Sequence, residues 1–142
     1  MRALLDVNVL IALLDRDHVD HGRARAWLEA EIETGWASCP ITENGLVRIL
    51  SQPNYPGPTT PAEAVRMLAR ATAQPHHRFW ACDLSVLDEA VVDRTRLHGP
   101  RQVTDAYLLA LATSRQGRFV TFDRSVPVSA VKGATEANLV VV

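Results

Sequence analysis

Short apolar runs alternate with longer stretches of helical periodicity along this chain. The apolar runs predict five strands, at Ala3 to Leu5, Trp36 to Cys39, Arg78 to Cys82, Arg118 to Phe122 and Leu139 to Val142. The periodic stretches predict six helices, over residues 7–14, 18–33, 40–50, 62–73, 85–96 and from Thr104 or Asp105 to about Gly117. Strands that are short and apolar on both faces, most of them separated by a helix, are typical of a parallel sheet with helices on both sides.

Prolines and capping residues mark several boundaries of these elements. Pro40 suits the first turn of the helix that follows the second strand. Ser85 followed by Asp88 resembles a shortened capping box, which predicts a helix over 85–96. The proline-rich segment 51–61 is the one clear loop, and it separates two predicted helices.

Length and composition fit one folded domain. The chain has 142 residues, 47% hydrophobic content and a formal net charge of -1, values typical of a globular protein. A single domain over residues 1–142 is therefore predicted, of the α/β class, with a central parallel sheet of about five strands flanked by helices on both faces. No apolar stretch approaches the roughly 20 residues that cross a bilayer, and the first strand begins directly after Met1. We therefore expect a cytoplasmic protein with no signal peptide and no membrane segment.

Four acidic residues lie where an apolar run gives way to a turn or to the start of a helix. They are Asp6, Glu43, Asp105 and Asp123. Right-handed crossovers place the carboxyl ends of all parallel strands at one edge of the sheet, and side chains just beyond those ends converge there. Carboxylates that gather without basic partners repel one another unless a divalent cation binds among them. The spacing therefore predicts one carboxylate pocket suited to a metal ion.

Each acid also has a structural explanation of its own. Asp105 could cap its helix, Glu43 could complement the dipole of a helix amino terminus, and Asp123 could serve a turn. Asp6 is harder to explain in this way. It lies between two apolar runs, and a buried carboxylate is costly unless it is paired or bound to metal. The pattern alone leaves both interpretations open.

The acids stand in four short motifs. In chain order these are Leu4-Leu5-Asp6-Val7-Asn8-Val9-Leu10, Thr42-Glu43, Thr104-Asp105-Ala106-Tyr107-Leu108-Leu109 and Val120-Thr121-Phe122-Asp123. The motifs resemble those of the PIN-domain nucleases and, more narrowly, of the VapC toxin ribonucleases of bacterial toxin–antitoxin pairs. Their order and spacing are specific as a set, and the resemblance covers essentially the whole chain. It identifies residues 1–142 as a PIN domain.

The resemblance carries expectations about the site and its partners. It implies that the four acids are the metal-binding and catalytic residues, with Asn8 and Thr104 as polar support beside them. It implies Mg²⁺, for which Mn²⁺ can substitute, an RNA substrate and a homodimer. It also implies a cognate VapB-like antitoxin whose carboxyl-terminal segment blocks the active site. Because no acidic position is missing, an active enzyme is favoured over a degenerate binding domain.

Metal-assisted hydrolysis is the chemistry that such a set of acids could perform. Ligation by oxygen alone suits Mg²⁺ or Mn²⁺. A divalent metal neutralises phosphate charge and lowers the pKa of a bound water. We expect Asp6 to be the central ligand, Asp105 and Asp123 to complete the site, and Glu43 to bind metal or orient a water. Attack by water predicts RNA products that carry a 5′-phosphate.

Histidines and cysteines give weaker signals. His18 and His21 have the spacing HxxH, but a zinc site needs further ligands with matched placement. Cys39 and Cys82 do not form a CxxC pair, and buried free thiols explain them better than a disulfide or a metal site.

Arginines near the acidic motifs are candidates for contacts with phosphate. Arg48, Arg101 and Arg124 could hold substrate phosphates or carboxylates of the antitoxin. A solvated position on the surface explains each of them more simply.

Two other functions stay open at this point. The same fold could serve as a non-catalytic module that binds RNA or a peptide, and metal-dependent cleavage would separate that module from an enzyme. A phosphatase-like α/β enzyme could use Asp6 as a covalent nucleophile. That chemistry resembles a DxD motif, whereas Asn8 stands at the third position here.

Overall fold

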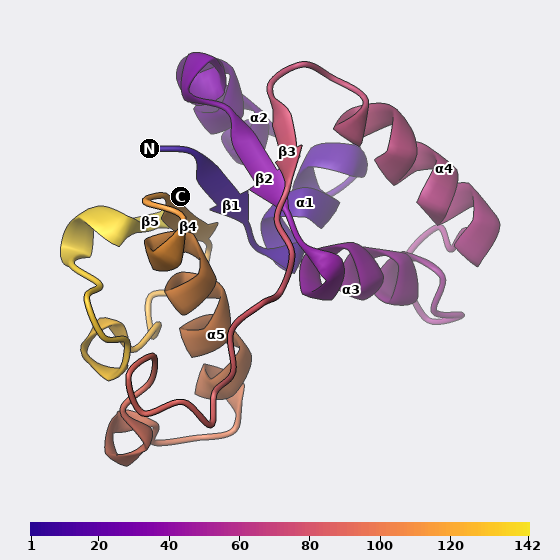
Figure 1. The fold of residues 1–142 in the computed structure, drawn as a ribbon. Helices are drawn as coiled ribbons and strands as arrows, with labels where there is room; N and C mark the ends of the chain where they lie inside the picture. Colours follow the sequence, from indigo (N-terminus) through magenta and orange to yellow (C-terminus); the bar gives the residue numbers. More distant parts are fainter.

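The computed structural model describes all residues from Met1 to Val142 and contains a five-stranded sheet. The strands are β1 (Ala3–Leu5), β2 (Trp36–Ser38), β3 (His77–Phe79), β4 (Arg118–Thr121) and β5 (Leu139–Val141). Their order across the sheet is β3-β2-β1-β4-β5, and every neighbouring pair is parallel (Figure 1). The predicted α/β fold with a parallel sheet of five strands is therefore confirmed.

Five α-helices and four short 3₁₀ helices connect the strands. The α-helices are α1 (Val7–Leu14), α2 (His21–Glu31), α3 (Pro40–Leu50), α4 (Pro61–Thr72) and α5 (Arg101–Ser114). The 3₁₀ helices are η1 (Ile32–Thr34), η2 (Arg94–Arg96), η3 (Val128–Ala130) and η4 (Glu136–Asn138). None of the helices has the length and apolar character needed to cross a membrane.

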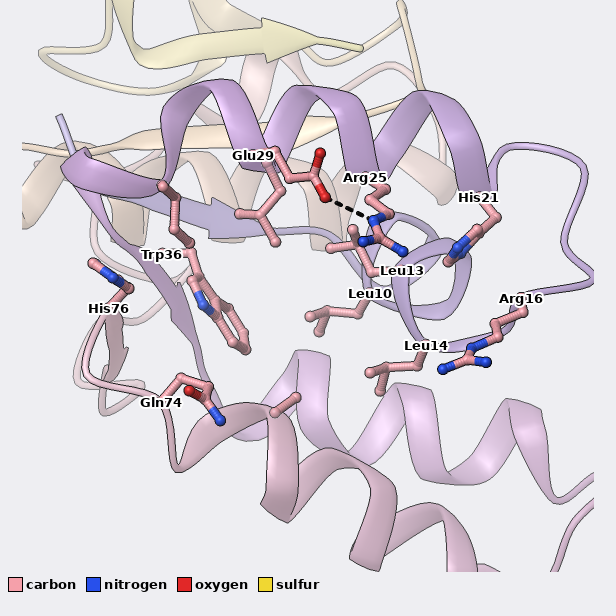
Figure 2. Close-up of a pocket in the computed structure, with 13 residues that line it drawn as sticks. Leu10, Leu13, Leu14, Arg16, His21, Arg25, Glu29, Trp36, Gln74 and His76 are labelled. Atoms are coloured by element: carbon pink, nitrogen blue, oxygen red, sulfur yellow. Dashed lines mark hydrogen bonds and ion pairs between the residues drawn. The ribbon is translucent and has the colours of Figure 1, made fainter.

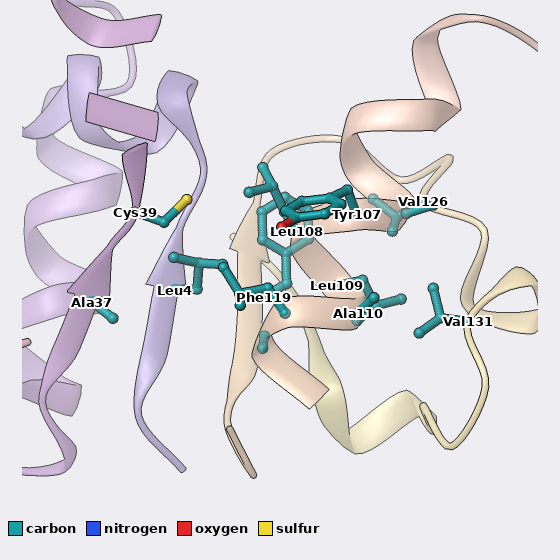
Figure 3. Close-up of a cluster of buried hydrophobic side chains, with 13 residues drawn as sticks. Leu4, Ala37, Cys39, Tyr107, Leu108, Leu109, Ala110, Phe119, Val126 and Val131 are labelled. Carbon is teal, nitrogen blue, oxygen red and sulfur yellow. The ribbon is translucent and has the colours of Figure 1, made fainter. Parts of the chain in front are cut away.

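The two faces of the sheet pack against different helices. Side chains alternate along a strand, so Leu4 of β1 and Phe119 of β4 join the buried cluster that contains the apolar face of α5 (Figure 3). Their neighbours Leu5 and Val120 join the second cluster, with residues of α1, α3 and α4. All four side chains are fully buried. This alternation explains why strands of three or four residues can hold helices on both sides of the sheet.

The helix predicted over residues 85–96 does not form. The segment is a series of turns that ends in η2. Side chains compete for its backbone amides: Ser85 accepts from the N–H of Leu87, and Asp88 accepts from the N–H two residues further on. Such local bonds offer the backbone an alternative to the helical ladder. Leu87 is 87% exposed, so the segment also lacks an apolar face to bury as a helix.

Several predicted boundaries shift by about three residues, and α2, for example, begins at His21 and not at residue 18. Helix α5 begins at Arg101, because Pro100 already has helical dihedral angles and starts the helix instead of blocking it. Asp105 therefore lies inside the helix and is not its cap. Strand β3 runs from His77 to Phe79 and not over 78–82, since it has partners only as far as Ser38, where β2 ends.

The strand order creates a topological switch point at the carboxyl edge of the sheet, next to β1. The chain leaves β1 toward β2 on one side, and β4 lies on the other side of β1. In open α/β sheets, ligands bind beyond the carboxyl ends of the strands at such a switch point. Asp6 follows β1 directly, and Asp123 follows the last residue of β4 after one intervening residue.

Candidate active site

Asp6 is a buried carboxylate at the amino end of α1. Its side chain is 8% exposed, and Oδ1 accepts a hydrogen bond of 2.7 Å from the backbone N–H of Val7, so Asp6 caps the helix. Oδ2 accepts a 2.7 Å bond from the hydroxyl of Thr121. Burial raises the pKa of Asp6 and the nearby Asp123 raises it further, while the bonds from Thr121 and Val7 act in the opposite direction. The charged form of Asp6 is therefore short of compensating positive charge.

Thr121 links the ends of β1 and β4. It is fully buried, and its hydroxyl oxygen accepts a 3.1 Å bond from the backbone N–H of Asp123 while it donates to Asp6. The carboxylate of Asp123 accepts from the backbone N–H and the hydroxyl of Ser125, both at 2.7 Å. These bonds from Ser125 lower the pKa of Asp123, so it stays ionised beside Asp6.

Asp105 reaches the same place from α5. Burial raises its pKa to about 6, and the negative charges of Asp6 and Asp123 add to the increase. Carboxylates influence one another in this way only when they lie close together. The structure thus brings together three of the four predicted acids, one from each of three separate segments of the chain.

Glu43 lies in the first turn of α3, as predicted, but it is engaged differently. Its Oε1 accepts a 2.6 Å hydrogen bond from the hydroxyl of Ser38, the last residue of β2. It is not among the charges that raise the pKa of Asp6 or Asp105. The hydrogen bond that Glu43 makes is thus with the end of β2, whereas Asp6 and Asp123 are linked at the ends of β1 and β4.

A close contact between α1 and α3 sets the separation of Asp6 and Glu43. A Cβ atom added at Gly45 would lie 2.7 Å from Cγ2 of Val7. Val7 directly follows Asp6, and Gly45 follows Glu43 by two positions. Only glycine at position 45 lets the two helix starts approach this closely.

Replacing Gly45 by Ala is expected to lower the free energy of unfolding by about 1 kcal/mol, because overpacking outweighs the better helix propensity of alanine. Gly22 of α2 is a matched control, since a Cβ atom there would meet nothing within 4 Å. Gly22→Ala should leave stability unchanged or raise it. Urea unfolding of both variants measures the difference, and equal stability of the two would contradict the packing argument.

The largest cavity lies elsewhere. It has a volume of about 580 Å³ and is lined by α1, α2, the start of β2 and the end of α4 (Figure 2). Leu10, Leu14 and Trp36 form apolar walls, and the ion pair between Arg25 and Glu29 stands on its rim. Trp36 begins β2, whereas Asp6 follows the end of β1, so the cavity belongs to the opposite end of the sheet. Cavity size alone would therefore misplace the carboxylate site.

The remaining predicted residues are solvent-facing. Asn8 and Thr104 are exposed, and neither side chain makes a hydrogen bond within the chain. Arg48, Arg101 and Arg124 are also exposed. Of these three, Arg101 helps to lower the pKa of Asp123, after the larger effect of Ser125. The role of Asn8 and Thr104 as polar support stays a prediction. Among the three arginines, Arg101 is the one whose charge acts on an acid of the site.

The weaker histidine and cysteine signals have structural explanations. Nδ1 of His18 accepts from the backbone N–H of Asp20 at 3.0 Å, and Nδ1 of His21 lies 2.8 Å from the carbonyl of Ala12. Both histidines are thus used in local bonds at the turn between α1 and α2. Cys39 is a buried free thiol and Cys82 a half-buried one, as expected.

The sequence motifs assign no role to three polar residues of this region. Thr121 appears in the fourth motif without a role, and Ser38 and His77 belong to no motif. Thr121 carries a hydroxyl two residues before the strand-end acid Asp123, and this spacing could have predicted a hydrogen-bonding role at the site. Ser38 and His77 lie 39 positions apart, and no local pattern pairs them.

The donor set fits a hard divalent cation. No group of three or more His, Cys, Asp or Glu side chains is already arranged so that it could hold a metal ion. The acids nevertheless act on one another electrostatically, since Asp123 raises the pKa of Asp6, and both Asp6 and Asp123 raise the pKa of Asp105. Oxygen-only donors with uncompensated negative charge are what Mg²⁺ and Mn²⁺ prefer.

Comparison with known families shows to which family the chain belongs. The model of the PIN domain family matches residues 3–131. The chain belongs to the PIN-domain family. Within that family it is 65% identical over 139 residues to the ribonuclease VapC44 of Mycobacterium tuberculosis, covering 98% of each chain. It is also 44% identical over 137 residues to the ribonuclease VapC39 of the same organism, covering 96% of this chain and 99% of the relative. The prediction of a VapC-like toxin ribonuclease is thereby confirmed.

Solved structures of other PIN-domain proteins share the fold. The VapC20 toxin of Mycobacterium tuberculosis, which cleaves the sarcin-ricin loop, superposes with a TM-score of 0.62 at 15% identity, over 96% of this chain and 98% of that one. VapBC2 of Rickettsia felis, solved with a DNA fragment from its promoter, gives a TM-score of 0.59 at 14% identity, over 87% and 89% of the two chains. At such low identity the likeness shows the fold alone.

Proposed function

We propose that this PIN-domain ribonuclease is a metal-dependent endoribonuclease that hydrolyses RNA phosphodiester bonds at the carboxyl edge of its sheet. In this proposal Asp6, Asp105 and Asp123 hold Mg²⁺, with Mn²⁺ able to replace it, and Glu43 completes the site. The observation that carries the proposal is the hydrogen-bonded link from the buried carboxylate of Asp6 through the hydroxyl of Thr121 to the backbone N–H of Asp123, which holds two of the predicted acids together at the ends of β1 and β4. Asp6 is buried, Asp105 is half-buried and Asp123 is exposed, and a divalent cation bound among them would offset the repulsion that adds to burial in raising the pKa of Asp105 to about 6.

In this proposal, different residues of the chain have different roles at the site. Thr121 and the amide of Val7 fix both oxygens of Asp6, so that its carboxylate keeps one orientation. Asp123 stays ionised through its bonds from Ser125. When bound, the divalent ion supplies positive charge to the phosphate and makes water a nucleophile at neutral pH. Arg101, on the exposed side, is placed to hold a phosphate of the RNA.

The partners that we propose are those that membership of this family suggests. We propose a VapB-like antitoxin as the inhibitor, whose carboxyl-terminal segment blocks the carboxylate site, and a homodimer in the cytoplasm as the assembled form. The VapBC2 complex of Rickettsia felis supports an antitoxin partner for this type of chain. Co-purification with the product of a neighbouring short reading frame would test this partner directly.

Incubation of the purified protein with total RNA tests the proposed reaction. We expect cleavage in Mg²⁺ or Mn²⁺, loss of cleavage in EDTA, and recovery when the metal is restored. Sequencing of the fragments should find 5′-phosphate ends, because water is the attacking group. Products with 2′,3′-cyclic phosphate ends would contradict attack by water. RNA binding without any metal-dependent cleavage would instead favour a non-catalytic module.

A further inference from the structure

A buried chain of three polar side chains joins β3, β2 and α3. Nε2 of His77 lies 2.8 Å from the hydroxyl of Ser38, and that hydroxyl lies 2.6 Å from Oε1 of Glu43. Ser38 is fully buried and His77 is 9% exposed. Buried polar groups are costly unless their hydrogen bonds are made. Each of the three side chains therefore depends on its neighbour for the hydrogen bond that offsets the cost of its burial.

The number of protons gives the chain a direction. While Glu43 is ionised it can only accept, so the single proton of the Ser38 hydroxyl must point at Glu43. The oxygen of Ser38 then accepts from His77, which requires a proton on Nε2 of the imidazole. The order of donation is His77 to Ser38 to Glu43.

The surroundings of His77 hold its ring in place. The imidazole packs against the indole of Trp36, with 4.5 Å between ring centroids. Arg2 donates from Nη1 to the carbonyls of Trp36 and His76, at 3.2 and 2.7 Å, and so ties the starts of β2 and β3 together. The donor end of the chain thus rests on the sheet, whereas Glu43 projects from a helix start.

We propose that Ser38 and His77 are positioning residues that hold the carboxylate of Glu43 at the β2 side of the metal site through this hydrogen-bonded chain. The inference rests on the proposed function, because it assigns Glu43 a fixed orientation toward the ion or the attacking water. A free glutamate side chain has several rotatable bonds, and Ser38 removes this freedom before the ion arrives. Outer partners that orient a metal ligand in this way typically change metal affinity by about 10- to 100-fold when they are lost.

Replacement of His77 tests the chain, because β3 is an edge strand and tolerates substitution better than the fully buried Ser38. His77→Leu removes the donor, whereas His77→Gln keeps an N–H group that can reach Ser38. His76→Leu is a matched control at the neighbouring position, whose side chain makes no hydrogen bond. Mn²⁺ binding by isothermal titration calorimetry should weaken about 10-fold or more in His77→Leu. It should stay within about 3-fold of wild type in His77→Gln and His76→Leu.

A double-mutant cycle decides whether His77 acts through Glu43. In the Glu43→Gln background, His77→Leu should change Mn²⁺ affinity by less than about 2-fold. If His77→Leu lowers Mn²⁺ affinity equally in the wild-type and Glu43→Gln backgrounds, the inference is overturned. It is also overturned if the wild type binds Mn²⁺ and His77→Leu binds it with the same affinity. A wild-type protein that binds no Mn²⁺ would contradict the proposed function itself, and the positioning role with it. Urea unfolding of each variant confirms that the titrated protein is folded.

Discussion

Replacement of Asp6 by Asn is expected to lower RNA cleavage about a thousandfold, which corresponds to about 4 kcal/mol of transition-state stabilisation. Asp6 is the most buried of the acids, and its two oxygens are held by Val7 and Thr121. Asn keeps the shape and one acceptor oxygen but removes the charge that a divalent ion needs. The loss should therefore appear in metal affinity and in cleavage together.

The same substitution should not harm the metal-free fold. Burial raises the pKa of Asp6, which means that its ionised form destabilises the native state at neutral pH. Asp6→Asn should consequently raise the free energy of unfolding in EDTA while it abolishes the stabilisation by metal. Asp17→Asn, at an exposed acid in the turn after α1, is the control and should resemble wild type. Full cleavage by an Asp6→Asn protein that no longer binds metal would remove the catalytic assignment.

Stability should depend on pH in opposite directions with and without metal. Asp105 has a pKa of about 6 in the native state, raised from 3.8 mainly by burial. A raised carboxyl pKa means that the native state binds the proton more tightly than the unfolded state. This contribution is complete below about pH 4 and is lost as the pH rises through 6. The metal-free protein should therefore gain stability from this group as the pH falls from 7 to 5.

Metal binding needs the same carboxylates in their ionised form, so protons compete with the ion. At pH 7.5 and a metal concentration of 100 times Kd, Mn²⁺ should raise the free energy of unfolding by about 2.7 kcal/mol. At pH 5 most of this stabilisation should be absent. Urea unfolding at several pH values, in EDTA and in Mn²⁺, measures both trends.

Comparison with Asp105→Asn isolates the contribution of this group from that of the other ionisable side chains. The variant should lose the stability gained between pH 7 and 5 in EDTA. If wild type and Asp105→Asn show the same pH dependence, the raised pKa of Asp105 is not linked to folding. If Mn²⁺ stabilises wild type equally at pH 5 and 7.5, the carboxylates are not its ligands.

The placement of the acids could be predicted because it follows from local pattern. Asp6 comes directly after three apolar residues, and Glu43 follows a proline that begins a helix. In a parallel sheet such positions share one edge whatever the details of packing. The sheet and its carboxyl edge could therefore be predicted from order and periodicity, whereas the joint assignment of the acids to one metal site came from the family resemblance.

Local pattern failed where side chains compete with the backbone. The segment 85–96 contains a capping-like pair and several apolar residues, yet Ser85 and Asp88 form turns there. Pro100 had the opposite outcome, since α5 begins directly after it and not at the predicted Thr104 or Asp105. In both places the sequence allows two local structures, and contacts with the rest of the chain select one.

The sequence by itself determined the alternation of strands and helices, the parallel sheet and the arrival of Asp6, Asp105 and Asp123 at one edge. Only the tertiary structure decided how these acids are held. Thr121 reaches Asp6 across 115 positions, and His77 reaches Ser38 across 39. Periodicity reports which face of an element is apolar, but a hydrogen bond depends on the register of two strands that meet only after folding. Local periodicity therefore determines the order of strands and helices, whereas the orientation of each carboxylate depends on partners distant in the chain.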